Sequence, residues 1–289
     1  MNYVYQREKQ VREELDNLYK SLGIKNRIFD NVEIDSNYPE EYGLIQMNAI
    51  QPPRFPDSLF KSLGRALHGQ NTTLFFDDGF QLNSETFAIL YEACRKIQLL
   101  SGNNKILLLK NPWDFTNFLH LKKAFPNAKF IFIHRHPIQV INSRLKTLRS
   151  VLENKNPYVA IQFKMYAKLF EMRIVLSAFR LVFLSEFFSE ARIWILSRNL
   201  TRAFSNFLDN INSLESKDFI SVKYEELCIE PDITISKILK FLSIEQNLAQ
   251  NCKTQIQPRG VKLLPEVNRR TNYICRHLKP YMSQFGYEI

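Results

Sequence analysis

The segment KILLLKNPWDFTNFLHLKKAFPNAKFIFIHRHPIQVINSRLKTLR, residues 105–149, contains two short apolar runs separated by a stretch of helical length. Lys105–Leu109 and Lys129–Ile133 have the continuous apolar character of buried parallel strands. The stretch between them has the apolar periodicity of a helix, so the segment predicts one βαβ unit. A cation follows each predicted strand, Lys110 after the first and Arg135 shortly after the second.

The residues after the second run predict an anion site. Pro137 is expected to begin a helix, because its fixed φ and missing N–H suit the first helical position. Free N–H groups at such a helix start attract anions, and no acidic residue lies between His134 and Arg149. Arg135 offers a planar fork for phosphate oxygens, and Ser143 offers a hydroxyl from the same side. The alternative is that Arg135 pairs with a carboxylate and Ser143 only fills space.

Length and composition indicate a globular chain with an affinity for anions. A chain of 289 residues with 45% hydrophobic content can bury a sizeable core. The net charge of +10 attracts nucleotides, phosphate, acidic glycans, nucleic acid or anionic lipid, and charge alone does not choose among them. The four cysteines lack metal-site or disulfide spacing, so no metal is expected. Without a signal-peptide pattern or an uninterrupted apolar span, we expect a cytoplasmic protein with no membrane span.

The remaining patterns predict an α/β protein, a parallel sheet flanked by helices with a large helical elaboration. We expect a single domain over residues 1–289, with an N-terminal helix within 1–25, a core βαβ unit over 105–150, a helical region over 158–212, and a C-terminal strand and helices over 219–289. The finer elements expected are helices over 4–22, 58–68, 85–100, 231–242 and 272–285, a strand over 219–223, and loop over most of 26–56. The first of these helices has an apolar face, with which it is expected to pack on the body of the protein; the face consists of Val4, Val11, Leu15, Leu18 and Leu22. Ligands of such sheets bind at the carboxyl ends of the strands, where Lys110, Arg135 and Tyr224 fall.

Four blocks of sequence, in this order, resemble the sulfotransferase superfamily. They are Lys110-Asn111-Pro112, FPNAKFIFIHRHP with Ser143 downstream, VKYEEL ahead of Pro231, and KILKFLSI from Lys237. The chain is most similar to the tyrosylprotein and bacterial carbohydrate-type branches, from about Arg27 to the C-terminus. The resemblance implies a P-loop-NTPase-like fold and a nucleotide donor, 3′-phosphoadenosine 5′-phosphosulfate (PAPS). It also implies transfer of the sulfuryl group to a hydroxyl of a carbohydrate, lipid or peptide.

The resemblance assigns donor-binding roles to five residues. Arg135 and Ser143 match the family pair that holds the 3′-phosphate, and Tyr224 matches a tyrosine near the adenine. Arg259 and Gly260 are similar to an Arg-Gly pair in a C-terminal loop that closes over the 3′-phosphate in family members. We therefore predict that these residues bind PAPS.

Catalysis requires a cation for the leaving phosphate and a base for the acceptor hydroxyl. Lys110 is predicted to meet the developing charge, the alternative being a solvated lysine at a strand end. Glu40 and Glu41 lie in a segment similar to the acidic family segment beside the acceptor and are the candidate bases, although acidic pairs in loops are commonly only solvated. Weaker candidates lie beside these groups: Asp114 as a base, and His134 and His136 as further anion contacts.

The sequence differs from the family in the loop that binds the 5′-phosphosulfate. The family's first strand and its Pro-Arg-Ser-Gly-Thr-Thr type loop have no equivalent ahead of Arg27, and the sequence after Pro53-Arg54 has no glycine for such a nest. We therefore expect a sheet reduced by its first strand. Two hypotheses follow, an active sulfotransferase and a degenerate member that binds the nucleotide or another anion without transfer. A nucleic-acid role is disfavoured because no recognised binding module is present, and a kinase because no Walker loop is.

Overall fold

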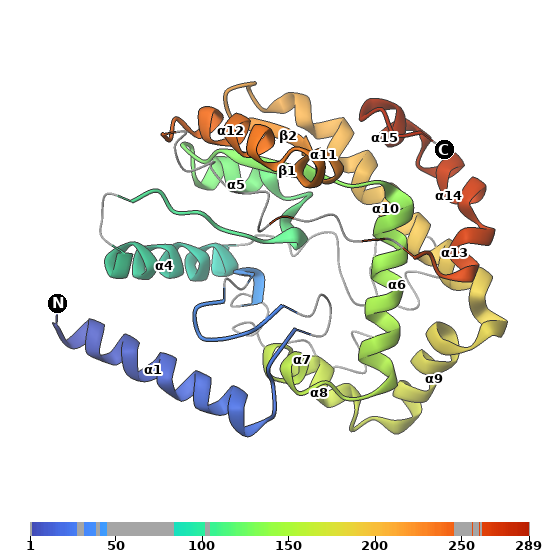
Figure 1. The fold of residues 1–289 in the computed structure, drawn as a ribbon, viewed down its shortest axis with the longest axis horizontal. Helices are drawn as coiled ribbons and strands as arrows, with labels where there is room; N and C mark the ends of the chain where they lie inside the picture. The colour runs from blue at the N-terminus through green and yellow to red at the C-terminus, as the bar shows by residue number, and fades with distance from the viewer. Residues whose placement is uncertain are drawn as a thin grey trace. The chain divides into compact units, whose positions relative to one another are not determined.

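The computed structural model describes residues 2–27, 32–38, 41–44, 84–101, 105–245, 256, 260 and 262–288. Within these ranges the chain is a helix-rich α/β protein with a small parallel sheet (Figure 1). Its elements are α1 (Asn2–Ser21), α4 (Ser84–Ser101), η1 (Pro112–Asp114), α5 (Phe118–Ala124), β1 (Phe130–His134), α6 (Pro137–Glu153), α7 (Pro157–Gln162), α8 (Lys164–Leu169), α9 (Arg173–Leu184), η2 (Glu186–Phe188), α10 (Ser189–Asn210), η3 (Ile211–Ser213), β2 (Phe219–Lys223), α11 (Tyr224–Ile229), α12 (Pro231–Leu242), α13 (Pro265–Arg269), α14 (Thr271–His277) and α15 (Lys279–Gln284).

The chain forms two compact units. The first comprises residues 1–114 and 147–185, and the second comprises residues 115–146 and 186–289. Helix α6 contributes residues to both. The single domain expected over residues 1–289 stays a prediction.

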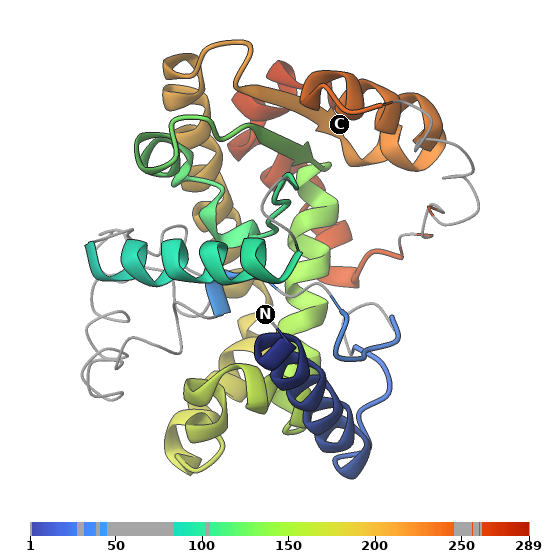
Figure 2. The same cartoon turned by 90° about the vertical axis from the view of Figure 1, so that its left-hand side faces the viewer.

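The second unit contains the sheet. β1 and β2 run parallel, with Phe130 opposite Phe219 and His134 opposite Lys223, and α11 and α12 follow β2 and contact it (Figure 2). The two strands predicted over 129–133 and 219–223 are thus confirmed, the first shifted by one residue. A buried cluster beneath them is largely aromatic, and the rings of Phe132 and Phe207 lie 4.9 Å apart in an edge-on contact. This core fixes the sheet edge at which both strands end.

Local signals located several helices correctly. α6 begins at Pro137 and α12 begins at Pro231, as the proline positions predict. The region over 158–212, where two or three helices are predicted, divides into four α-helices, α7 to α10. The helix predicted over 272–285 is two helices, because the chain turns at Leu278 and Pro280 cannot donate a backbone hydrogen bond to the preceding turn.

Two expectations about the first unit are wrong. The apolar run 105–109 has no regular secondary structure, and the side chains of Ile106 and Leu108 are 67% and 79% exposed. α1 forms and ends before Gly23, whose φ of 67° suits glycine, but Val11 on its apolar side is 55% exposed. Among residues 8–21 of α1, whose burial the structure describes, Tyr19 is the buried one, and its ring packs 6.4 Å from that of Tyr158.

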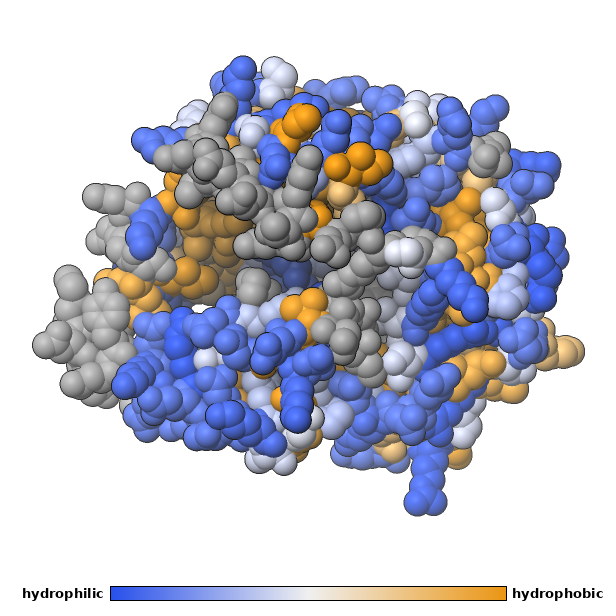
Figure 3. All heavy atoms as spheres, in the orientation of Figure 1, coloured by the Kyte–Doolittle hydropathy of each residue, from blue (hydrophilic) through white to orange (hydrophobic). Residues whose placement is uncertain are grey.

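Polar contacts with residues 36 and 37, and not the predicted apolar face, attach α1 to the segment that follows it. Arg12 donates to the side-chain oxygen of Asn37 at 2.6 Å, and Asp16 accepts the backbone N–H of Ser36 at 2.7 Å. The face drawn in Figure 3 is likewise mainly hydrophilic where the structure describes it. No helix in the described part of the chain has both the length and the apolar character needed to cross a bilayer. The helix predicted over 58–68 lies outside the described residues.

Candidate functional site

Arg135 and Tyr224 meet at the carboxyl edge of the sheet. Because His134 and Lys223 are partners in the parallel register, the residues that follow β1 and β2 emerge side by side. The half-buried guanidinium of Arg135 lies 4.6 Å from the centre of the Tyr224 ring, and its Nε donates to Oε1 of Gln139 at 3.0 Å. No carboxylate in the described part of the chain pairs with this guanidinium. The two donors at its tip therefore suit an anionic ligand.

The start of α6 is occupied by a carboxylate of the protein itself. Oε1 of Glu225 accepts the backbone N–H of His136 at 3.0 Å, and the N–H of Ile138 lies 3.3 Å from Nδ1 of His136. Oε2 of Glu225 accepts the hydroxyl of Tyr287 at 3.2 Å, where burial first, and then the Glu225 charge, raise the pKa of Tyr287. The free N–H groups expected at this helix start are thus already paired, so an anionic ligand here depends on Arg135.

His134 is a core residue and not an anion contact. Its side chain is 1% exposed, its ring stacks on Phe285 at 3.7 Å, and its nitrogens bond to the hydroxyls of Tyr281 at 2.7 Å and Ser221 at 3.0 Å. Burial lowers the pKa of His134 to about 4, so the imidazole is neutral near pH 7. The expectation that it contacts an anion is wrong, because the last residue of β1 points into the aromatic core.

Ser143 lies on α6 beside an anchored C-terminal segment. The side chain of Ser143 is exposed, whereas that of the preceding Asn142 is 3% exposed. Asn142 donates to the carbonyl of Lys262 at 3.2 Å and accepts the N–H of Leu264 at 2.8 Å. The segment that follows Gly260 is therefore attached to the helix that carries Ser143. Gly260 itself is exposed, and the Arg259 of the predicted loop lies outside the described residues.

In the first unit, Lys110 and Glu41 form an ion pair. Nζ of Lys110 lies 2.8 Å from Oε1 of Glu41, and a guanidinium nitrogen of Arg27 lies 3.8 Å from the same oxygen. Both cations also lie over the ring of Tyr38, at 5.3 Å for Arg27 and 5.8 Å for Lys110. Sequence reasoning chose Lys110 and Glu41 for separate roles and missed Arg27, which no motif marks. Glu40 lies outside the described residues.

Asp114 supports the turn that follows Lys110. Its side chain is 5% exposed, accepts the hydroxyl of Tyr42, and accepts Nδ2 of Asn111 at 2.8 Å. Burial first, and then the Asp114 charge, raise the pKa of Tyr42. The N–H of Tyr42 also donates to the carbonyl of Lys110 at 3.2 Å. These bonds fix the backbone on both sides of the Lys110–Glu41 pair, which makes Asp114 a structural residue.

Comparison with known proteins identifies the family. A family model described as "Sulfotransferase family" matches residues 59–247, well over half of the chain. This chain is a member of the sulfotransferase family. A solved structure, "Sulfotransferase Domain from the Curacin Biosynthetic Pathway", is 15% identical, with 95% of this chain and 94% of that chain covered and a TM-score of 0.36. None of the curated proteins matches the chain.

The range matched to the sulfotransferase family contains most of the predicted site. Lys110, Arg135, Ser143 and Tyr224 lie within it, whereas Glu41 and the 259–260 pair lie outside it. Among the described residues, no group of three or more His, Cys, Asp or Glu could hold a metal ion.

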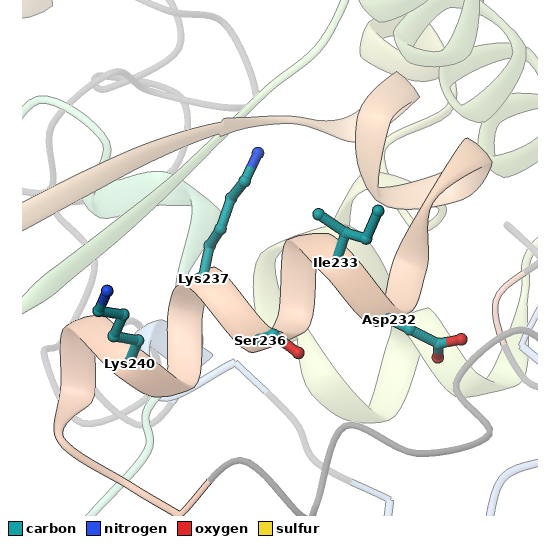
Figure 4. A pocket seen from close by; sticks show the side chains of 5 residues that line it. All are labelled: Asp232, Ile233, Ser236, Lys237 and Lys240. Atoms are coloured by element: carbon teal, nitrogen blue, oxygen red, sulfur yellow. The ribbon is translucent and has the colours of Figure 1, made fainter.

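A hollow of about 370 Å³ is lined by none of the predicted site residues that the structure of this sulfotransferase-family protein describes. Its lining comes entirely from α12, from which Lys237 and Lys240 extend (Figure 4). The lining residues are Asp232, Ile233, Ser236, Lys237 and Lys240.

Proposed function

We propose that this sulfotransferase moves a sulfuryl group from PAPS to a hydroxyl of a carbohydrate, lipid or peptide. One observation carries the proposal. The Arg135 guanidinium is held against the Tyr224 ring at 4.6 Å, with no carboxylate partner in the described part of the chain. A half-buried guanidinium without a counter-ion favours an anionic ligand, and in this family that ligand is the donor nucleotide.

In this proposal the 3′-phosphate of the donor binds at the second unit. The two terminal guanidinium nitrogens of Arg135 donate to two phosphate oxygens, and the exposed hydroxyl of Ser143 donates to a third. Tyr224 supports the guanidinium from one side and offers its ring edge to the adenine. Arg259 and Gly260 complete the phosphate contacts, as the resemblance implies.

The transfer step is an in-line displacement at sulfur. The acceptor oxygen forms a bond to sulfur while the bond from sulfur to the 5′-phosphate oxygen breaks, and negative charge grows on the departing phosphate. Lys110 neutralises that charge, and the acceptor proton passes to the carboxylate of Glu41 or Glu40. Lys110 must leave its pair with Glu41 to do so, which frees the carboxylate oxygen for the acceptor hydroxyl.

Calorimetric titration of the full chain with 3′-phosphoadenosine 5′-phosphate, the desulfonated donor, tests the binding half of this proposal. We expect micromolar binding that Arg135→Ala weakens at least tenfold. Arg198→Ala is the matched control, because Arg198 also lies over an aromatic ring, at 5.2 Å from the centre of Trp194. If the wild-type chain binds no nucleotide, the donor assignment is wrong.

A binding protein without transfer activity is the second candidate. It is favoured by Lys110, which is engaged by Glu41 at 2.8 Å. Incubation with donor carrying radioactive sulfur and a panel of carbohydrate, lipid and peptide hydroxyls separates the two candidates. Labelled product supports the enzyme, whereas nucleotide binding with no product across the panel supports the binding protein.

A further inference from the structure

One carboxylate joins the residue after Arg135 to the residue after Tyr224. Oε1 of Glu225 accepts the backbone N–H of His136 at 3.0 Å, a bond across 89 positions. The parallel register of β1 and β2 brings the ends of the two strands side by side, and this bond then ties the start of α6 to the start of α11. A hydrogen bond between a carboxylate and a backbone N–H is charge-assisted and stronger than a neutral one. The bond therefore restrains the two chain segments from which the Arg135 and Tyr224 side chains extend.

The C-terminal segment holds this carboxylate in place. Oε2 of Glu225 accepts the hydroxyl of Tyr287 at 3.2 Å, and burial first, and then the Glu225 charge, raise the pKa of Tyr287, so that its hydroxyl keeps the proton that it donates. Gly286, at a φ of 60°, turns the chain back after α15, and the N–H of Tyr287 donates to a carbonyl of that helix at 2.9 Å. The carbonyl of Glu288 then lies 3.0 Å from Nε2 of His136. Two contacts thus attach this segment to the start of α6, one through Glu225 and one direct.

The charge of Glu225 by itself disfavours an anionic ligand at Arg135. A half-buried carboxylate beside an anion site repels the ligand, because like charges interact strongly where water is partly excluded. Each oxygen of Glu225 accepts a hydrogen bond from a neutral group, so these contacts do not neutralise its charge. Removing only the charge should therefore strengthen anion binding, whereas removing a positioning contact should weaken it. The two roles predict effects of opposite sign.

We propose that Glu225 is a positioning residue whose carboxylate, held by Tyr287, keeps the start of α6 where the Arg135 guanidinium stacks on the Tyr224 ring. This inference rests on the proposed function, in which the stacked guanidinium binds the donor nucleotide. Tyr287 lies beyond the range 59–247 that matches the sulfotransferase family, so the family match does not assign it a role. Loss of the carboxylate should weaken nucleotide binding even though it removes a repulsive charge.

Calorimetric titration with 3′-phosphoadenosine 5′-phosphate compares the wild type with variants of Glu225 and its neighbour. Glu225→Ala removes the acceptor of the His136 N–H and should weaken binding about tenfold. Glu225→Gln keeps a carbonyl oxygen as that acceptor and should bind at least as tightly as the wild type, because the amide carries no negative charge. Glu226→Ala is the matched control, because it removes the same charge from the next residue, whose side chain is 53% exposed, and should stay within about twofold of the wild type.

The Arg135 side chain supplies a readout that needs no ligand. Its guanidinium carbon lies 4.6 Å from the centre of the Tyr224 ring, so the magnetic resonance of its Nε–H group carries a shift caused by the ring. This resonance is identified by its loss in Arg135→Lys. In Glu225→Ala it should move toward the position of an exposed arginine, whereas Glu225→Gln and Glu226→Ala should leave it unchanged. A loss of overall stability without a change in the stacking would not move it.

A second variant serves if Glu225→Ala does not fold. Tyr287→Phe removes only the hydroxyl that holds Oε2 of Glu225 and keeps the ring, so the chain should fold. We expect nucleotide binding to weaken about threefold and the Nε–H resonance of Arg135 to move in the same direction as in Glu225→Ala. Unchanged binding and an unchanged resonance in Tyr287→Phe would then overturn the inference.

The results separate this inference from the proposed function. A wild-type chain that binds no nucleotide overturns the proposed function and this inference with it. A wild-type chain that binds, while Glu225→Ala binds as tightly or with an unchanged Arg135 resonance, leaves the proposed function standing and overturns only the inference. Equal weakening by Glu225→Ala and Glu225→Gln would also overturn it, because the charge and not the acceptor would then matter. Weaker binding by Glu225→Ala alone, with a shifted resonance, supports it.

Discussion

Nζ of Lys110 lies 2.8 Å from Oε1 of Glu41, so the proposed catalytic cation and a proposed base are bonded to each other. The lysine side chain is 47% exposed and the glutamate side chain 14% exposed. Because water reaches the lysine end of the pair and screens its charge, the pair contributes about 1 kcal/mol. A donor phosphate can replace Glu41 as the partner of Lys110 at small cost, whereas Arg27 stays within 3.8 Å of Glu41.

The first prediction concerns this exchange. Glu41→Gln releases Lys110, so the affinity for the desulfonated donor should rise by up to about fivefold while transfer falls. Lys110→Met should reduce transfer by about 100-fold or more, since it removes the cation at the leaving phosphate. Calorimetry measures the first effect and labelled-product formation the second. The control is Lys105→Met, a change at an exposed lysine five residues earlier. Unchanged affinity and unchanged transfer in Glu41→Gln would contradict the role of the pair.

The second prediction uses the stacking of Arg135 on Tyr224. Arg135→Lys keeps the charge but loses the planar fork and its contact with the ring, so donor affinity should fall about tenfold or more. Tyr224→Phe keeps a ring under the guanidinium and should stay within about threefold of the wild type, whereas Tyr224→Leu should resemble Arg135→Lys. Arg198→Lys makes the same substitution at another ring-stacked arginine and should have no effect. Equal affinities for Arg135→Lys and the wild type would show that the fork is not used.

The sequence predicted the elements with local signals and missed those that depend on pairing. A proline at the first helical position located α6 and α12, and β-branched and aromatic residues located β2. The run 105–109 predicts a strand because continuous apolar character indicates burial, yet such a run does not say which strand will pair with it. Ile106 and Leu108 of this run are exposed, so the burial that would accompany pairing in a sheet is absent from these two residues.

In the candidate site too, the sequence predicted individual residues but not the contacts that depend on strand pairing. The resemblance to the sulfotransferase family points to Arg135 and Tyr224, and the register that joins His134 to Lys223 brings them into contact. The same register brings Glu225 to the backbone N–H of His136, a contact across 89 positions that no local pattern predicts. The sequence could show that an anion belongs at this helix start, but not that the chain supplies one itself.

The third prediction concerns a buried ion pair. Arg192 is fully buried in α10 and donates to Oε1 of Glu266, at the start of α13, at 3.0 Å. Glu266→Ala removes the buried carboxylate of this pair and leaves the guanidinium with the exposed Glu186, 3.8 Å away, which should lower the free energy of unfolding by about 3 kcal/mol. Urea denaturation followed by circular dichroism measures this.

The control for that pair is the exposed ion pair between Lys217 and Glu215, whose side chains are 74% and 70% exposed. Glu215→Ala should leave the free energy of unfolding nearly unchanged, because water screens both charges. The double variant Arg192→Met/Glu266→Leu should regain most of the loss, because apolar side chains of similar volume remove the buried charge. Equal costs for Glu266→Ala and Glu215→Ala would mean that burial does not decide the strength of the pair.

The fourth prediction is a loss of stability in mild acid that originates at His134. Burial lowers the pKa of its imidazole from 6.5 to about 4 in the folded state. Between these two values the unfolded chain binds a proton that the folded chain does not, so the free energy of unfolding falls as the pH falls through this window. From this group alone the loss should be about 3 kcal/mol between pH 7 and pH 4, and none should occur above pH 7.

Urea denaturation at several pH values isolates this contribution by comparing variants. His134→Gln should be less stable than the wild type at pH 7, since glutamine cannot reproduce the stack on Phe285, but its stability should fall less between pH 6.5 and pH 4. His277→Gln, a change at an exposed histidine, should keep the wild-type slope. The stability curves of His134→Gln and the wild type should therefore converge in acid. The wild-type imidazole must release its proton to enter the aromatic core, and glutamine has no such proton to release. Parallel curves for His134→Gln and the wild type would place the acid sensitivity elsewhere in the chain.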